Sequence, residues 1–311
     1  MKKYVKIFLP VIIFLFSLHL SSVSKETLQK DIVYEWDLIR IVDGTQSPTG
    51  SFQEVIAIDL DNEGSLYILD RGRNRLLKYA GNGLFLKEIG GFGDSADQFD
   101  DPRDVDAHLT LNVYVADYNN SRIVRFDSNL NYLNELRTSY QSPIYFEFPL
   151  SIAVNGQYDI FLLEDVNKSI LKFNRFNEPL AAFGSPMENI GQLLGPYQLS
   201  DGVKNEIFVC DPLKKSILAF DYLGNFLREV SHPAFQELKG ISVSHRNELA
   251  VADLKGGKIF FFENGYKFST ISDLQYLNIK PIDVSLWHPR GAAKRTLFVA
   301  DAQRCSIFRE K

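Results

Sequence analysis

Short apolar segments that each end in an acidic residue return at a regular interval along the chain. The six segments are LYILD at 66–70, VYVAD at 113–117, IFLLE at 160–164, IFVCD at 207–211, LAVAD at 249–253 and LFVAD at 297–301. Their acidic ends are 47, 47, 47, 42 and 48 positions apart. Self-similarity at such a period indicates units that each bury their apolar faces against their neighbours.

Each repeat contains four predicted strands. A short apolar strand precedes each acidic segment, as in VIAID at 55–59 and SIAV at 151–154. Five positions after the acidic residue, a third strand begins with Arg, Ser or Lys, as in RIVRF at 122–126. A turn such as AGNG at 80–83 then leads to a fourth strand, because Asn and Gly accept the positive φ of tight hairpins. Four antiparallel strands in roughly 45 residues are typical of a propeller blade.

The repeats therefore predict an all-β fold, a six-bladed β-propeller of four-stranded antiparallel blades. The last repeat reaches Lys311 after three strands, and EWDLIRI at 35–41 supplies a candidate for the fourth. We expect this N-terminal strand to close the ring in the last blade, because closure removes open sheet edges.

The repeat resembles a known family. The segment FDDPRDVDAHLTLNVYVADYNNSRIVRFD at 99–127 and the connection GGFGDSADQFDDP at 90–102 are similar to the NHL repeat and its inter-blade segment. The resemblance covers about residues 50 to 311, and blades three and four depart from it at Glu164 and Pro212. It implies the propeller fold but not one function, since NHL propellers include enzymes, protein binders and RNA binders.

The N-terminal residues have the pattern of a secretory signal peptide. Lys2, Lys3 and Lys6 precede an apolar stretch at 7–20, which is short for a membrane span of about 20 residues. Small residues at 22–24 predict cleavage before Lys25. We expect a signal peptide at 1–24, a short linker at 25–33 and the propeller at 34–311. The protein would be exported to the periplasm or outside the cell, or anchored if the signal is not cleaved.

Charge and cysteine content narrow the possible partners. The formal net charge is −5, which disfavours nucleic acid as a partner. Cys210 and Cys305 fall in blades four and six, so their Cα atoms are expected to lie beyond the ~7 Å that a disulfide allows. We expect a monomer with no stable membrane span after signal cleavage.

The acidic residues that end the six segments are interpreted as structural. An Asp at the end of a strand accepts N–H groups of the following turn, and it is expected to pair with the basic or hydroxyl residue five positions on. A residue that recurs at the same position of every blade indicates a structural role, whereas a binding site is confined to one part of the molecule. The aromatic residues that end the third strands are predicted to pack between blades; they are Tyr79, Phe126, Phe173, Phe220 and Phe262.

A functional site is predicted where the inner strands begin, at one mouth of the central channel. The candidates for ligand or partner binding there are Glu54, Arg103, Asp104, Tyr197, Gln198, Lys239 and Asp283. The loops after the repeated acidic residues should lie on the same face because successive strands alternate in direction. They carry a basic rim made of Arg71, Arg73, Lys168, Lys214, Lys215, Lys255 and Arg304. This rim is either a surface for an anionic ligand or a set of ordinary solvated loop tips.

These features favour a binding scaffold over an enzyme, with a protein or an anionic cell-envelope ligand as partner and with no cofactor and no catalytic residue. The alternative is a metal-dependent hydrolase or lyase, as six-bladed lactonases and NHL-type amidating lyases are. Its candidate ligands for Ca²⁺ at the channel mouth are Glu54, Asp104 and Asp283, together with Asp106. No His lies where an inner strand begins, which disfavours both a zinc site and a Ser–His–Asp triad.

Overall fold

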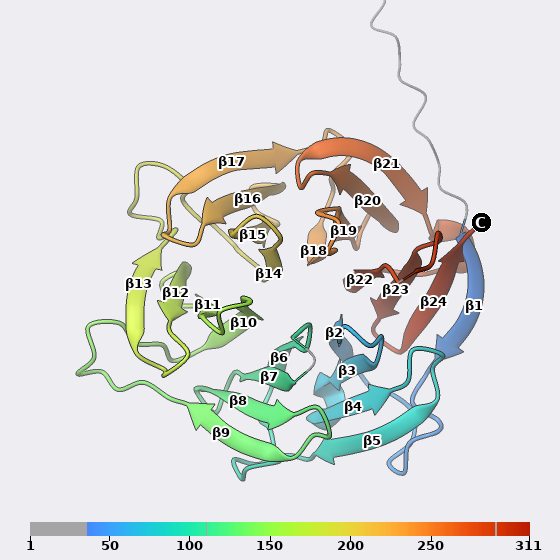
Figure 1. The fold of residues 1–311 in the computed structure, drawn as a ribbon, viewed down its shortest axis with the longest axis horizontal. Coiled ribbons are helices and arrows are strands. Elements are labelled where there is room, and N and C mark those ends of the chain that lie inside the picture. Colours follow the sequence, from blue (N-terminus) through green and yellow to red (C-terminus); the bar gives the residue numbers. More distant parts are fainter. Residues whose placement is uncertain (1–35, 110, 290) are drawn as a thin grey trace, which may run out of the picture. The chain divides into compact units, whose positions relative to one another are not determined.

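The repeats fold into six four-stranded antiparallel sheets arranged in a ring (Figure 1), as predicted. The computed structural model describes residues 36–109, 111–289 and 291–311. Blades one to three consist of β2 (Val55–Leu60), β3 (Leu66–Asp70), β4 (Arg75–Tyr79) and β5 (Phe85–Gly90); β6 (Pro102–Asp106), β7 (Asn112–Asp117), β8 (Arg122–Asp127) and β9 (Tyr132–Leu136); and β10 (Pro149–Val154), β11 (Ile160–Glu164), β12 (Ser169–Phe173) and β13 (Pro179–Phe183).

Blades four to six complete the ring. They consist of β14 (Gln198–Gly202), β15 (Glu206–Asp211), β16 (Ser216–Asp221) and β17 (Phe226–Ser231); β18 (Leu238–Val243), β19 (Leu249–Asp253), β20 (Lys258–Glu263) and β21 (Lys267–Asp273); and β22 (Asp283–Trp287), β23 (Thr296–Asp301), β24 (Arg304–Glu310) and β1 (Trp36–Val42). Two single-turn 3₁₀ helices, Arg71–Arg73 and Gln275–Leu277, are the helical elements of the described residues.

The N-terminal strand closes the ring, which confirms the prediction from the strand count. β1 pairs with β24 in antiparallel register from Trp36↔Glu310 to Val42↔Cys305, and the two strands lie side by side in Figure 1. Trp36 also reaches blade five, where its indole N–H donates to the Ser272 hydroxyl at 2.8 Å and its ring stacks on Phe261. The first described strand therefore holds the last blade both to its own sheet and to its neighbour.

The hydrophobic core lies between the blades. Five of its members are the aromatic residues that end the third strands, and all are at most 1% exposed; they are Tyr79, Phe126, Phe173, Phe220 and Phe262. Their predicted packing role is confirmed. Burial of one such side chain stabilises a fold by about 1.5–3 kcal/mol, so the ring depends on every blade having two neighbours.

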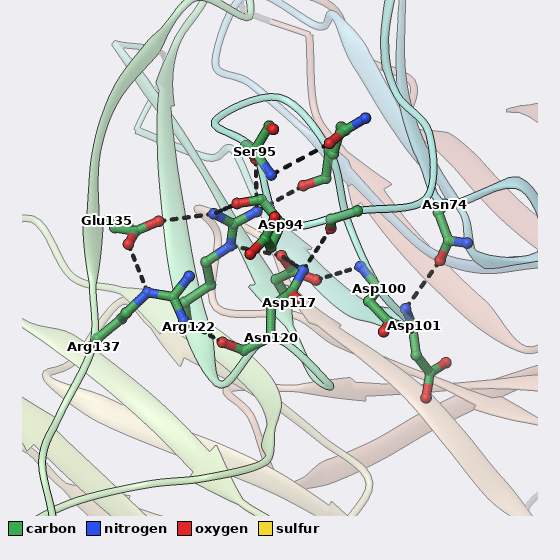
Figure 2. A network of polar contacts seen from close by, with 12 residues as sticks. Asn74, Asp94, Ser95, Asp100, Asp101, Asp117, Asn120, Arg122, Glu135 and Arg137 are labelled. Atoms are coloured by element: carbon green, nitrogen blue, oxygen red, sulfur yellow. Dashed lines mark hydrogen bonds and ion pairs between the residues drawn. The ribbon is translucent and has the colours of Figure 1, made fainter.

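The repeated Asp is structural, as predicted, and Figure 2 shows the contacts in blade two. Asp117 accepts hydrogen bonds from the Asp100 backbone N–H, the Asn120 amide and Arg122 Nε at 2.7–2.8 Å. Arg122 then donates to backbone carbonyls of the connection that enters the blade, at 94–98. The pair thus fixes the path of the chain from one blade to the next.

The repeated Asp was expected to pair with the residue five positions on, and two blades in which that residue is Ser lack this pairing among the described residues. In blade four the Ser216 hydroxyl is buried without a hydrogen-bond partner among the described residues, and so is that of Ser306 in blade six. Asp211 instead accepts backbone N–H groups, including those of Leu194 and Lys214, at 2.7–3.1 Å. The serine side chain is too short to span the gap that Arg122 bridges.

Two predictions about the whole chain can be compared with the structure. Cys210 and Cys305 are free and buried, which confirms that they form no disulfide with each other. No helix among the described residues is long and apolar enough to cross a membrane. The predicted signal peptide at 1–24 and linker at 25–33 lie outside the described residues.

Candidate functional site

Polar side chains on the inner strands link neighbouring blades around the whole axis. At each of the six junctions a side chain accepts a hydrogen bond of 2.7–3.2 Å from a backbone N–H of the next blade. The acceptor and donor residues are Asp283 and Ile58, Asp59 and Ala107, Asp104 and Ile152, Ser151 and Leu199, Gln198 and Ile241, and Ser242 and Leu286. Buried backbone donors need such partners, so these polar residues hold the ring together.

Three of the predicted channel residues meet across the axis. The Gln198 amide donates to Asp104 Oδ1 at 3.2 Å and to Asp283 Oδ2 at 3.3 Å. All three side chains are buried. Burial raises the pKa of Asp104 to about 7, although hydrogen bonds from Ser151 and Ile152 oppose the shift. Burial also raises the pKa of Asp283 well above its usual value, and the nearby Asp104 adds to the effect. This bridge forms a polar floor across the channel.

The remaining predicted channel residues lie on the strand-start face, the face where the inner strands begin. Arg103 stacks on the Tyr118 ring at 4.5 Å, and the Lys239 ammonium lies 4.5 Å from the centre of the Tyr197 ring. Glu54 forms an ion pair with Arg71. The space between Arg103, Tyr197 and Gln198 measures about 10 Å³, which accommodates about one water molecule.

The basic rim also lies on the strand-start face, as predicted, because Val55 at the start of β2 pairs with Asp70 before the loop that carries Arg71 and Arg73. Several of its charges are compensated. Arg71 pairs with Glu54, Lys168 with Asp165 and Arg304 with Asp301, and Arg73 donates to the Ser51 carbonyl. Lys214, Lys215 and Lys255 form no ion pair with a described residue, and neither does Arg73, so most of the uncompensated charge lies on blades four and five.

A larger cavity opens on the opposite side of the floor, at the strand-end face, where the inner strands end. This axial cavity has a volume of about 250 Å³. Asp104 and Gln198 line its base, and residues of all six inner strands, β2, β6, β10, β14, β18 and β22, form its wall. His108, His245 and Trp287 are among the residues that line it beyond or near the strand ends.

Carboxylates from three blades and one imidazole gather in the axial cavity. The side chain of Asp106, the last residue of β6, lies 2.9 Å from His108 Nδ1. Single ligand atoms of Asp59, Asp106 and His108 all lie within 4.8 Å of one another. Asp201 of blade four lies on the other side of the imidazole, 3.9 Å from His108 Nε2. We call these four residues the axial cluster.

The members of the axial cluster shift one another's pKa values. Burial and the neighbouring Asp106 raise the pKa of Asp59 to about 7. Burial raises the pKa of Asp201 to about 6, against the hydrogen bond from Tyr222. Burial acts to lower the pKa of His108, but Asp106, Asp59 and Asp201 raise it to about 9. The protonated imidazole therefore supplies positive charge that offsets the negative charge of these carboxylates. A bound metal cation could supply the same positive charge in its place.

The axial cluster was not predicted as a unit. Asp106 was a candidate ligand at the mouth where the inner strands begin, and no role was predicted for His108, Asp59 or Asp201. The available signal was the position of Asp59, Asp106 and Asp201 near the ends of three inner strands, with His108 two residues beyond. Inner strands of a propeller run in the same direction, so their ends converge on one mouth of the channel.

Comparisons with solved structures support the fold. No protein-family model matches the chain, and no curated protein matches it in sequence. A streptogramin B lyase has a TM-score of 0.61 at 12% identity, with 88% of this chain and 98% of that one covered. Virginiamycin B lyase from Staphylococcus aureus has a TM-score of 0.59 at 14% identity, with 88% and 99% covered. A protein of unknown function from Bacteroides thetaiotaomicron has a TM-score of 0.59 at 12% identity, with 89% and 72% covered. At these identities the likeness concerns the six-bladed fold alone.

Proposed function

We propose that this propeller is a ligand-binding protein that holds a divalent cation in the axial cavity. The observation that carries the proposal is the convergence of Asp59, Asp106 and His108, with ligand atoms within 4.8 Å of one another. Ligand atoms at about 2.0–2.6 Å from a shared ion lie at most about 5 Å apart, so the spacing fits one ion. The resemblance to NHL repeats and the six-bladed fold are compatible with a site in the channel.

The donor types suggest which cations to test. Carboxylate oxygens suit Mg²⁺, Ca²⁺ and Mn²⁺, and the single imidazole adds affinity for a transition metal. Ca²⁺, the ion considered from the sequence, is therefore proposed again with a different ligand set. The Gln198 amide bridges Asp104 and Asp283, and Arg71 pairs with Glu54, so these carboxylates already have side-chain partners. Asp59 and Asp106 each accept one backbone N–H of the next blade through Oδ2, which leaves Oδ1 of each outside these inter-blade bonds.

The test is calorimetric titration of MnCl₂ and CaCl₂ into the purified protein after treatment with a chelator. We expect one ion per chain, with binding that weakens at least about tenfold in His108→Gln, because one ligand is lost. His108 accepts no inter-blade backbone hydrogen bond, so this variant should keep the ring intact. Asp97→Asn, which removes an exposed carboxylate from the connection between blades one and two, is the matched control. Absence of stoichiometric binding, or equal affinity in His108→Gln, would reject the site.

A metal-dependent lyase or hydrolase is the second candidate, and the Asp106–His108 contact favours it. A carboxylate on Nδ1 orients an imidazole so that Nε2 can exchange a proton with a bound substrate. Two of the structural neighbours are named as lyases of streptogramin B and virginiamycin B. We propose to assay cleavage of virginiamycin B, lactones and simple esters with the metal-loaded protein. Turnover that His108→Gln abolishes and Asp97→Asn retains would support catalysis, and no turnover on any of these would leave the protein as a binder.

We also propose that the basic rim binds a partner, and that its lysines on blades four and five make the contact. Asp211 fixes the loops that carry Leu194 and Lys214, and Leu213 beside Lys214 is 73% exposed. The partner would be an acidic protein surface or an anionic cell-envelope polymer. Retention on an anionic matrix should fall in Lys214→Glu with Lys215→Glu, and the fall should shrink as salt rises. Equal retention at low and high salt would reject the rim.

Export is proposed from the N-terminal sequence alone. Expression of the full chain in a bacterium, followed by N-terminal sequencing of the protein from the periplasm and medium, tests it. A mature protein that begins at Lys25 is expected, and an intact N-terminus in the membrane fraction would indicate an anchor instead.

A further inference from the structure

A second cavity lies on the strand-end face between blades two and three, outside the ring of inner strands. Its volume is about 360 Å³. Strands β7–β9 of blade two supply one wall, and the turns before β11 and β13 of blade three supply the other. Leu111, Tyr114, Arg125, Tyr158, Arg175 and Phe176 characterise this inter-blade groove.

The groove is positively charged in a protein that is acidic overall. Arg125 and Arg175 both line it, and none of its lining residues is acidic. Arg125 Nε donates to Asn112 Oδ1 at 3.0 Å, and the guanidinium lies 5.6 Å from the centre of the Tyr114 ring. The Arg175 guanidinium lies 4.8 Å from the centre of the Phe176 ring. Neither arginine forms an ion pair with a described residue, in contrast to Arg75 and Arg122.

The same groove offers exposed apolar surface. Leu111 is 65% exposed and Phe176 is 69% exposed, one on each side. Tyr114 and Ile160 are buried. The volume falls in the range of about 300–1,000 Å³ typical of small-molecule sites, and such sites combine apolar walls with a few polar groups. Two uncompensated guanidinium groups beside such walls select an anion that also has an apolar body.

We propose that the inter-blade groove binds an organic carboxylate with an apolar chain or ring, with the carboxylate on Arg125 and Arg175. A guanidinium matches the planar carboxylate with two parallel N–H donors. The apolar body would lie against Phe176 and Leu111. The groove shares no residue with the axial cluster, so this proposal does not depend on the proposed cation site, and either can fail alone.

Calorimetric titration of the purified protein with sodium decanoate tests the proposal, with decanol and sodium acetate as the two matched probes. We expect one decanoate per chain and much weaker binding of both other probes. Decanol lacks the charge and acetate lacks the apolar chain. Equal binding of decanol would show a merely apolar groove, equal binding of acetate would show a merely charged one, and no binding of decanoate would reject the site; each of these overturns the proposal.

Substitutions separate the contribution of the positive charge to binding from that of the apolar surface. Arg175→Gln, at an exposed turn where folding should be unaffected, is expected to raise the Kd for decanoate about tenfold. Phe176→Ser should raise it while leaving its salt dependence unchanged. Arg246→Gln removes an exposed arginine from a turn of blade five and is the matched control. Loss of affinity in Arg246→Gln equal to that in Arg175→Gln would mean that overall charge, and not the groove, attracts the ligand.

Discussion

Arg122 Nε lies 2.7 Å from the Asp117 carboxylate, and both side chains are almost completely removed from solvent. The arginine continues into the connection from blade one, where it donates to the carbonyls of Asp94, Ser95 and Gln98. One ion pair thereby fixes both the end of β7 and the path of the chain between two blades (Figure 2).

Substitution of Arg122 should strongly lower the stability of the folded protein. Arg122→Met leaves Asp117 as a buried charge without its cation and removes the donors of three carbonyls. We expect the free energy of unfolding to fall by about 3–5 kcal/mol, measured by urea denaturation. Ser216→Ala changes the equivalent position of blade four, where the hydroxyl has no partner, and should cost less than about 1 kcal/mol. Similar losses in both variants would show that the ion pair is not what stabilises blade two.

Removal of the closing strand should weaken blade six first. Deletion of residues 31–42 uncovers β24, and Cys305 loses its neighbour Val42. We expect a lower melting temperature and faster reaction of Cys305 with a thiol reagent. Cys210 in blade four is the internal control and should stay protected in the folded state. An equally stable deletion variant with both thiols protected would contradict the role given to β1.

In the intact protein the two thiols should report global unfolding. Both are fully buried, and burial raises the pKa of each, which disfavours the reactive thiolate. Labelling under native conditions should therefore follow the unfolding rate and be equal for Cys210 and Cys305. Faster labelling of Cys305 alone, measured by mass spectrometry, would reveal local opening at the junction between β1 and β24.

Stability should decline as the pH rises toward neutrality because of Asp104. Its pKa is about 7 in the folded protein, whereas an ordinary Asp has a pKa of 3.8, so between these values the folded state binds a proton that the unfolded state has released. The free energy of unfolding then falls with increasing pH from about 4 to about 7, and the full penalty persists above that. Asp104→Asn should reduce this slope in denaturation experiments. An unchanged slope would mean that other groups, such as Asp59 and Asp201, determine it.

The repeat pattern was sufficient to predict the architecture. Within each period of 42–48 residues, segments of alternating or consecutive apolar residues predict four strands. Each blade has two apolar faces and therefore needs a neighbour on both sides, which requires a ring. The closure by β1 followed from the count of strands at both ends of the chain. The roles of the repeated Asp and of aromatic residues such as Tyr79 and Phe126 followed from their recurrence.

Which residues of the candidate site lie close together could be learned only from the tertiary structure. The sequence placed Asp104 and Asp283 at a channel mouth, but it did not show that Gln198 joins them into a floor or that Arg103 and Tyr197 narrow the space on the strand-start face. Asp59, Asp106 and Asp201 belong to three different blades, and their distances depend on how far each inner strand extends along the axis.

The physical reason lies in the range of the interactions. Strand formation and blade order arise from the local alternation of side chains and from contacts between adjacent repeats, which the sequence repeats six times. The approach of Asp106 and His108 to Asp59 and Asp201 arises from blades packing around a common axis, and those residues differ in every repeat. The sequence by itself determined the ring, and only the packed ring decided which end of its channel holds a cavity and which charged groups meet there.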